Sequence, residues 1–310
     1  MVEENKNDRN NKNHKSCKRK KNNNEKKIER PEEPAACTAQ QQPPKKKNRK
    51  EVAIFGNYRN YYGYRVGQDL EEDPRLKVMK REWFEGKDSL DIGCNSGLLT
   101  IAIARKFGCK SIFGVDIDGA RIEDAHWTLR KVVNARMHNV PSKIPKSVDA
   151  KVVNGAAESL TEGKRDNDGD SPLLVEKDLF KIVSFQKGNF VQNWRPPANT
   201  YYQTILCLSV TKWIHLNWGD DGLITLFRRA WTLLQPGGVF ILEPQPWSSY
   251  YNNRLVSETA SANYKNIQIP PEDFQDVLLD KVGFRMVENL TSGLSGTKSG
   301  FDRPILAFWK

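Results

Sequence analysis

The chain has 310 residues, of which 49 are Lys or Arg and 38 are Asp or Glu, so its net charge is +11. No apolar run reaches the ~18 residues that a membrane helix needs, and the first residues lack the apolar segment of a secretory signal. We therefore expect neither membrane association nor secretion. The five cysteines form no C-x-x-C pair, which argues against a disulfide framework and a structural zinc site and fits a reducing compartment.

The positive charge is concentrated in the first 50 residues. This segment holds 16 basic residues, 7 acidic residues and no Phe, Trp or Tyr. Burial of so few apolar side chains cannot offset the entropy lost on folding. We therefore predict a disordered basic tail over 1–50 and one domain over 51–310. Two clusters, Lys18–Lys21 and Pro43–Lys50, are typical of nuclear import signals and of arms that attract RNA, although a merely solubilising tail is the alternative.

Strand and helix patterns alternate from residue 87 onward. The predicted strands are Ser89–Ile92, Ser111–Asp116, Phe180–Phe185, Tyr202–Ser209, Val239–Glu243, Gly283–Leu290 and Pro304–Trp309. The predicted helices are Leu98–Phe107, Asp118 or Gly119 to about Ala135, Gly222–Leu234 and Pro271–Asp280. Helical crossovers indicate an α/β fold with parallel strands, and because no helix separates the last two strands, we expect them to pair antiparallel at a sheet edge. Residues 155–178 are predicted to form an inserted surface loop.

The motif Asp91-Ile92-Gly93-Cys94-Asn95-Ser96-Gly97 lies between the first strand and the first helix. Glycines at this turn let the backbone approach a ligand, but Asn95 stands where a dinucleotide-binding pattern has its middle glycine. Asp116 ends the next strand, where a carboxylate accepts hydrogen bonds from both hydroxyls of a ribose. A ribose diol without a pyrophosphate favours S-adenosylmethionine over NAD. A βα turn with an unrelated surface Asp is the alternative, and a NAD-linked dehydrogenase fits poorly.

Three segments interleave aromatic side chains with Arg or Lys, namely 56–65, 209–220 and 243–251. Such segments suit stacked bases and phosphates, although core aromatics covered by Lys and Arg stems would give the same pattern. Three of them around one crevice favour an RNA-like ligand. The chain has four His and no evident Ser/His/Asp or paired-carboxylate signature, so we expect no metal ion and no dedicated general base.

These motifs resemble those of the bicoid-interacting-type RNA methyltransferases. The resemblance covers about residues 54–310 and is carried by Asp91-x-Gly93-Cys94-Asn95-x-Gly97, by Leu208-Ser209-x-Thr211-Lys212-Trp213-Ile214-His215-Leu216-Asn217-Trp218-Gly219-Asp220 and by Glu243-Pro244-Gln245-Pro246-Trp247-Ser248-Ser249-Tyr250. Gly56-Asn57-Tyr58 and Tyr61-Tyr62-Gly63-Tyr64-Arg65 also match. The resemblance implies a Rossmann-like class I S-adenosylmethionine-dependent methyltransferase, with a mostly parallel seven-stranded sheet and an antiparallel edge.

The resemblance also implies the site residues. Cofactor contacts are implied at Tyr62, Arg75, Gly93, Cys94, Asn95, Asp116, Ile117, Asn189, Phe190 and Leu208. The residues implied near the RNA end, which would act by positioning, are Lys212, Trp213, His215 and Trp218. Phe190 is a departure, because the most similar family members have Tyr there. We further expect Lys212 and either Arg65 or Arg303 to bind phosphates.

The activity implied is transfer of a methyl group from S-adenosylmethionine to the γ-phosphate of a 5′-triphosphate small nuclear or other non-coding RNA, that is, methylphosphate capping. Two alternatives stay open: a 5′-monophosphate RNA as acceptor, or an RNA-binding scaffold of a small ribonucleoprotein with little turnover. The expected partners are RNA and RNA-binding proteins of such a particle. We expect a nuclear monomer.

Overall fold

The computed structural model describes residues 53–59, 61, 72–137, 179–293 and 303–310. All of these lie in one unit, Lys50–Lys310. The predicted tail over 1–50, the insert loop over 155–178, Tyr62 and Arg65 lie outside the described residues and stay predictions.

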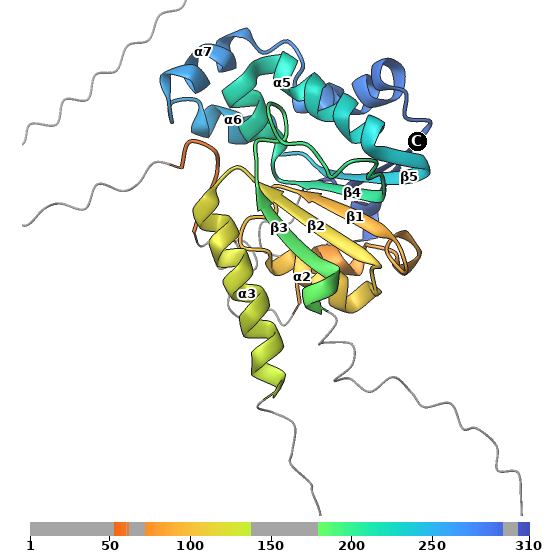
Figure 1. The fold of residues 1–310 in the computed structure, drawn as a ribbon. Coiled ribbons are helices and arrows are strands. Elements are labelled where there is room, and N and C mark those ends of the chain that lie inside the picture. The colour runs from red at the N-terminus through yellow and green to blue at the C-terminus, as the bar shows by residue number, and fades with distance from the viewer. Residues whose placement is uncertain (1–52, 60, 62–71, 138–178, 294–302) are drawn as a thin grey trace, which may run out of the picture. The chain divides into compact units, whose positions relative to one another are not determined.

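A mixed sheet is the centre of the described part of the chain, with its seven strands in the order β3-β2-β1-β4-β5-β7-β6 (Figure 1). The strands are β1 (Asp88–Ile92), β2 (Ser111–Asp116), β3 (Val183–Lys187), β4 (Tyr202–Leu208), β5 (Leu234–Glu243), β6 (Met286–Asn289) and β7 (Leu306–Trp309). β1 to β5 pair in parallel, whereas β7 runs antiparallel to both β5 and β6. The predicted parallel sheet with an antiparallel edge is confirmed.

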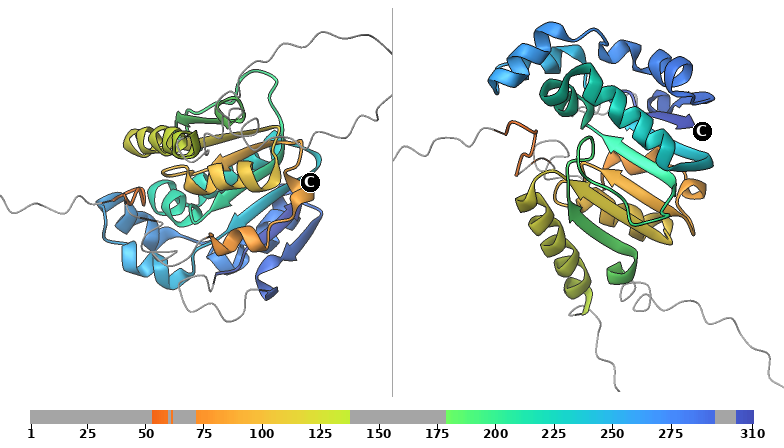
Figure 2. Two further views of the ribbon diagram at one scale, coloured as in Figure 1. Left: turned by 90° about the horizontal axis from the view of Figure 1, so that it is seen from below. Right: turned by 45° about the horizontal axis from the view of Figure 1, so that its top comes forward.

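Alternate side chains of the strands enter two separate cores, one on each face of the sheet. On β5, Val239 and Ile241 belong to one core, and Phe240 and Leu242 to the other. Helices α2 (Leu98–Phe107) and α3 (Gly119–Met137) cover the first face, and α5 (Thr211–Leu233) covers the second (Figures 1 and 2). Because both faces are covered, the free edge where ligands can enter is the one at the carboxyl ends of the parallel strands.

Some boundaries differ from the sequence predictions. α5 begins at Thr211 rather than Gly222, and it contains a kink at Gly219, whose φ and ψ are 61° and −165°. β5 begins at Leu234, the last residue of the predicted helix, rather than at Val239. The predicted helix over 271–280 is a 3-10 turn (Pro271–Asp273), then α8 (Phe274–Asp276), then a π-helical turn (Val277–Val282). Two helices were not predicted, α6 (Trp247–Asn253) and α7 (Glu258–Asn266).

None of the described helices combines the length and the apolar character needed to cross a membrane. In the same residues, no three His, Cys, Asp or Glu side chains gather closely enough to hold a metal ion.

Candidate active site

The turn between β1 and α2 is built for close approach of a ligand. Gly93, Asn95 and Gly97 all have positive φ, of 78°, 49° and 71°. A side-chain carbon added at Gly93 would lie 2.3 Å from Val210 Cγ2, and one added at Gly97 would lie 2.6 Å from Phe185 Cζ. The two glycines are therefore required both by their backbone conformation and by the lack of space.

Asp116 is fixed at the end of β2 by two backbone donors. Its Oδ2 accepts a hydrogen bond from the N–H of Asn95 (2.9 Å), and its Oδ1 accepts one from the N–H of Asp118 (2.9 Å). Burial raises the pKa of Asp116, and these two hydrogen bonds oppose that rise by favouring the charged form. Each oxygen keeps a lone pair for a further donor, so the carboxylate can accept two hydroxyls of a ribose.

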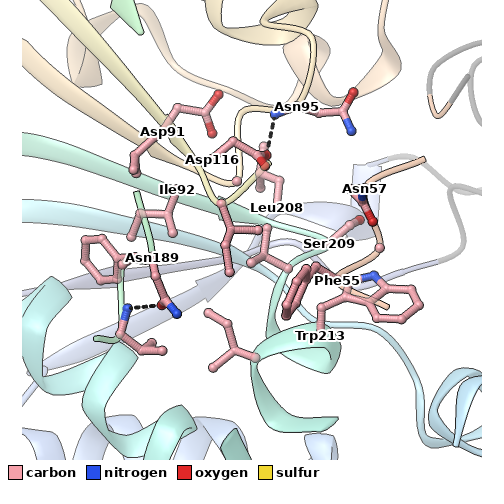
Figure 3. Close-up of a pocket in the computed structure, with 18 of the residues that line it drawn as sticks. Phe55, Asn57, Asp91, Ile92, Asn95, Asp116, Asn189, Leu208, Ser209 and Trp213 are labelled. Carbon is pink, nitrogen blue, oxygen red and sulfur yellow. Dashed lines mark hydrogen bonds between the residues drawn. The ribbon is translucent and has the colours of Figure 1, made fainter. Parts of the chain in front are cut away.

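A cavity lies at the carboxyl ends of β1, β2 and β4, and we call it the strand-end cavity (Figure 3). Most of the predicted cofactor residues line it, namely Arg75, Gly93, Asn95, Asp116, Ile117, Asn189, Phe190 and Leu208. Cys94 is not among the lining residues, because its side chain is buried in the core behind the turn. The structure thus brings together residues from five separate segments that the sequence analysis had placed at one site.

Two buried charged groups form the floor of this cavity. The Arg75 guanidinium, 1% exposed, pairs with Asp73 (2.6 Å) and Glu243 (3.3 Å). Burial raises the pKa of Asp91 to about 6, although Thr100 Oγ1 donates to its carboxylate (2.6 Å) and Arg75 lies nearby. Because Arg75 is already paired twice, it holds Glu243 and the end of β5 in place as well as lining the cavity.

Residues 53–59, which we call the strap, contribute Phe55, Gly56 and Asn57 to the lining of the strand-end cavity. Phe55 stacks on Trp218 with 5.8 Å between ring centroids and 7° between planes. A side-chain carbon added at Gly56 would lie 2.0 Å from Trp213 Nε1, so this glycine presses directly on the indole. The sequence analysis noted segment 56–65 for its aromatic and basic side chains and for its resemblance; its packing on α5 follows from these contacts.

A second cavity of about 590 Å³ adjoins the first, and we call it the basic cavity. Its lining includes Arg59, Lys212 and Arg303, together with Trp213 and uncharged polar side chains of α6. None of its described lining residues is acidic. The positive charges that line this cavity are therefore suited to binding an anion with several oxygens.

Lys212 is held at a defined point of the basic cavity. Its Nζ donates to Ser249 Oγ (2.8 Å) and to Asn253 Oδ1 (2.6 Å), and it lies 4.2 Å from the centroid of the Trp213 ring. Burial, and then the nearby charge of Arg303, lower the pKa of Lys212 to about 7. An anion entering the cavity would favour the charged ammonium and raise that pKa again.

Trp213 lines both cavities and forms the wall between them. Its ring makes an edge contact with Tyr58 of the strap, with centroids 5.8 Å apart. Figure 3 shows Trp213 beside Phe55, Asn57 and Ser209, at the side of the strand-end cavity away from Asn189.

His215 does not line either cavity. It is fully buried, with Nε2 2.7 Å from Asp220 Oδ1 and Nδ1 3.3 Å from the hydroxyl of Tyr250. Burial lowers the pKa of His215, although Asp220 opposes this. Asp220 also accepts from the N–H of Gln268 (2.9 Å), so Asp220 connects α5 with the segment after α7, while His215 contacts Tyr250 of α6. The geometry favours a packing role rather than the position near an RNA end that the resemblance implied.

The sequence analysis missed several residues of the site. Asn57, Arg59 and Ser249 line the cavities and lie within segments that the sequence analysis noted, but they were given no role of their own, and Asn253 lies outside those segments. Three of them are uncharged polar residues without a recognisable spacing, so only the fold reveals them. Of the two arginines considered as phosphate ligands, Arg303 lies in the basic cavity.

Comparison with known proteins assigns the family. The sequence model of the bicoid-interacting protein 3 family matches residues 202–310. A probable RNA methyltransferase of Arabidopsis thaliana is 62% identical over 265 residues, which cover 84% of this chain and 82% of that protein. The chain belongs to the bicoid-interacting protein 3 family. The resemblance predicted from the motifs is thus confirmed.

Two further relatives carry more specific names. The 7SK snRNA methylphosphate capping enzyme of Homo sapiens is 39% identical over 272 residues, which cover 83% of this chain but only 39% of that enzyme. The U6 snRNA methylphosphate capping enzyme of Drosophila melanogaster is 37% identical over 260 residues, which cover 83% of this chain and 74% of that enzyme. This family member therefore spans less than half the length of its human relative.

The family assignment agrees with the predicted RNA methyltransferase activity. The methyl donor predicted from the sequence is S-adenosylmethionine. The residues present fit this cofactor. The glycine turn has no space for side chains, and the Asp116 carboxylate has lone pairs for a ribose.

Proposed function

We propose that this protein transfers a methyl group from S-adenosylmethionine to the γ-phosphate of a 5′-triphosphate small nuclear RNA. One observation carries the proposal: a cavity lined by Arg59, Lys212 and Arg303, and by no acidic residue of the described chain, adjoins the donor cavity across Trp213. A triphosphate needs several cationic donors, whereas a base or a ribose hydroxyl needs none. The similarity to snRNA methylphosphate capping enzymes supports the same acceptor.

The donor would be held by the residues of the strand-end cavity, with its ribose on Asp116. When bound, S-adenosylmethionine supplies an electrophilic methyl group on a sulfonium. Trp213 lies between the two cavities, where its ring electrons can face that positive charge. We assign the remaining predicted contacts to the same cofactor, with Tyr62 and Cys94 as the two that rest on the resemblance alone.

The acceptor oxygen needs no general base. The second pKa of a terminal phosphate is ~6, so its oxygens are already largely anionic at pH 7. Catalysis is then mainly positioning, in which Lys212 and Arg303 hold the phosphates so that one oxygen meets the methyl group. Ser249 and Asn253 fix the Lys212 ammonium, and Ser209 Oγ accepts a hydrogen bond from Arg303 (3.1 Å). His215 acts as a packing residue in this proposal.

The test uses labelled S-adenosylmethionine and three versions of one RNA, with a 5′-triphosphate, a 5′-monophosphate or a 5′-hydroxyl. We expect label on the triphosphate RNA only, and its loss when the terminal phosphates are removed. Label on the monophosphate RNA would establish the alternative acceptor, and equal label on the hydroxyl RNA would refute phosphate methylation. Donor and RNA binding with negligible label on every RNA would favour the scaffold alternative.

A matched pair of lysine variants sharpens the test. Lys212→Met removes one of the cations that line the basic cavity. Lys80→Met removes an exposed lysine that pairs with Glu288 (3.0 Å), and neither Lys80 nor Glu288 lines either cavity. We expect only Lys212→Met to lower the rate on triphosphate RNA.

We also propose that the protein acts in the nucleus and that the clusters Lys18–Lys21 and Pro43–Lys50 direct it there. A nuclear RNA as substrate requires this location, and short basic runs act as import signals. Replacing the basic residues of both clusters by Gln in the full chain should move a fluorescent fusion out of the nucleus. An unchanged distribution would refute this assignment.

A further inference from the structure

The strap contributes lining residues to both cavities, as Tyr61, Ser209 and Trp213 also do. Phe55, Gly56 and Asn57 line the strand-end cavity, and Gly56, Tyr58 and Arg59 line the basic cavity. Any interaction that fixes the strap on the donor side therefore also fixes Tyr58 and Arg59 on the acceptor side.

Two hydrogen bonds hold the strap from opposite directions. On one side Asn217 Nδ2, on α5, donates to the carbonyl oxygen of Ile54 (2.9 Å). On the other side Asn57 Nδ2 donates to Asp118 Oδ2, in the turn that follows β2. The hydrogen bond to Asn57, together with those from backbone N–H groups, keeps the pKa of Asp118 low despite partial burial.

The carbonyl oxygen of the Asn57 amide, Oδ1, has no hydrogen-bond donor among the described residues. This oxygen is also buried. A buried carbonyl oxygen without a donor destabilises the folded state, and native proteins rarely retain one without a reason. Asn57 lines the strand-end cavity, and Figure 3 shows it on the same side of that cavity as Phe55 and Trp213.

We propose that Asn57 is a donor-binding residue: its Oδ1 accepts a hydrogen bond from an N–H or O–H of the adenosine part of S-adenosylmethionine, and this contact couples donor binding to the RNA site. The adenosine part is indicated because Asn57 is bonded to Asp118, two residues after the Asp116 carboxylate that can hold the ribose. The donor then completes the strap, and the strap presents Tyr58 and Arg59 to the RNA. The RNA half of this inference rests on the proposed function.

A purely structural role for Asn57 makes a different prediction. If Asn57 only anchors the strap, then removing the opposite anchor, Asn217, should weaken donor binding to the same extent. If Oδ1 contacts the donor, Asn57→Ala should weaken it much more than Asn217→Ala, which leaves Oδ1 in place and removes no lining residue of the donor cavity.

The first experiment titrates S-adenosylhomocysteine, the demethylated donor, into the full-length proteins by calorimetry. We expect Asn57→Ala to raise Kd about tenfold, as loss of one buried hydrogen bond predicts, and Asn217→Ala to raise it less than about threefold. In turnover assays the donor KM should rise in Asn57→Ala while kcat changes little. Melting without ligand identifies misfolded variants, and Asn57→Ser provides a second substitution without the amide. A wild-type Kd in Asn57→Ala, or equal effects of the two asparagines, would overturn the proposal.

The second experiment measures the coupling. The affinity for a short 5′-triphosphate RNA is measured by fluorescence anisotropy with and without saturating S-adenosylhomocysteine. Because coupling between two ligands is reciprocal, we expect the ligand to strengthen RNA binding at least about fivefold in the wild type and to have almost no effect in Asn57→Ala. An unchanged ratio in the variant refutes the coupling. If no protein binds this RNA better than a 5′-hydroxyl RNA, the proposed function fails, while the calorimetry still decides the role of Asn57.

Discussion

Replacing Lys212 by Met should remove a pH-dependent contact with the RNA. An ammonium group has three N–H donors, and in the structure two of them go to Ser249 and Asn253. The third remains for a phosphate oxygen. A neutral amine has only two N–H groups, both already used, so only the charged form of Lys212 can add a bond to the RNA. Such a charge-assisted bond contributes about 1.5–3 kcal/mol, which corresponds to about 10–150-fold in affinity.

The sign of the pH dependence follows from the lowered pKa. Burial and then Arg303 lower the pKa of Lys212 to about 7 in the free protein, so above pH 7 binding of RNA must also take up a proton. Affinity should therefore fall as the pH rises above 7, with a slope that approaches tenfold per pH unit until the pKa of the RNA complex is reached. The phosphates contribute little in this range because they are fully ionised above about pH 7.

The assay is anisotropy with a 5′-triphosphate RNA at constant ionic strength, between pH 6.5 and 8.5, with S-adenosylhomocysteine present to prevent turnover. We expect a rising Kd in the wild type and in the control Lys80→Met, and a weak, nearly pH-independent binding in Lys212→Met. The same pH slope in Lys212→Met and the wild type would show that another group titrates, and would refute this account of Lys212.

Four further outcomes follow from the geometry. The pKa of Lys212 is lowered in the folded state, so Lys212 reduces the stability of the fold at neutral pH, and this effect diminishes as the pH approaches 10.5. Lys212→Met should therefore raise the free energy of unfolding at pH 7 by about 1–3 kcal/mol in urea titrations. A decrease would contradict the burial argument. Gly93→Ala, with its positive φ and only 2.3 Å to Val210, should weaken S-adenosylhomocysteine binding more than about tenfold by calorimetry, and unchanged binding would show that the turn relaxes. Asp116→Ala should raise the same Kd about 10–100-fold, and normal affinity would exclude the ribose contact. His215→Ala should lower the free energy of unfolding by about 2–4 kcal/mol but leave the Kd of the folded protein unchanged; a large change in Kd would return His215 to the site.

The donor half of the site could be predicted from the sequence because it depends on local patterns. The strand, glycine turn, helix and terminal Asp116 follow one another in the chain, so their order is visible without the fold. Arg75 entered through the resemblance alone. Its two buried ion pairs join it to Asp73 and to Glu243, which is 168 residues away, and no local pattern encodes such a partnership.

The acceptor half was harder to predict because its residues carry weak signals. α5 was expected to begin at Gly222, since the run from Lys212 to Trp218 shows no single apolar face: Lys212 and Trp213 meet the basic cavity, while His215 and Leu216 are buried. The kink at Gly219 further breaks the helical period. The roles of Ser249 and Asn253 could not be predicted, because an uncharged polar residue on an unpredicted helix has no distinguishing pattern.

One hydrogen-bonded array lies beneath both cavities, and it explains why they keep a fixed relation. Arg75, which lines the strand-end cavity, pairs with Glu243; Glu243 accepts from Ser209 Oγ (2.7 Å); and the same Oγ accepts from Arg303, which lines the basic cavity. Ser209 adopts a left-handed conformation, with φ of 63°, which a non-glycine residue maintains only when its surroundings fix it. Positioning catalysis requires donor and acceptor to be held to a fraction of an ångström, and a floor shared by both cavities meets this requirement better than two independent sites would.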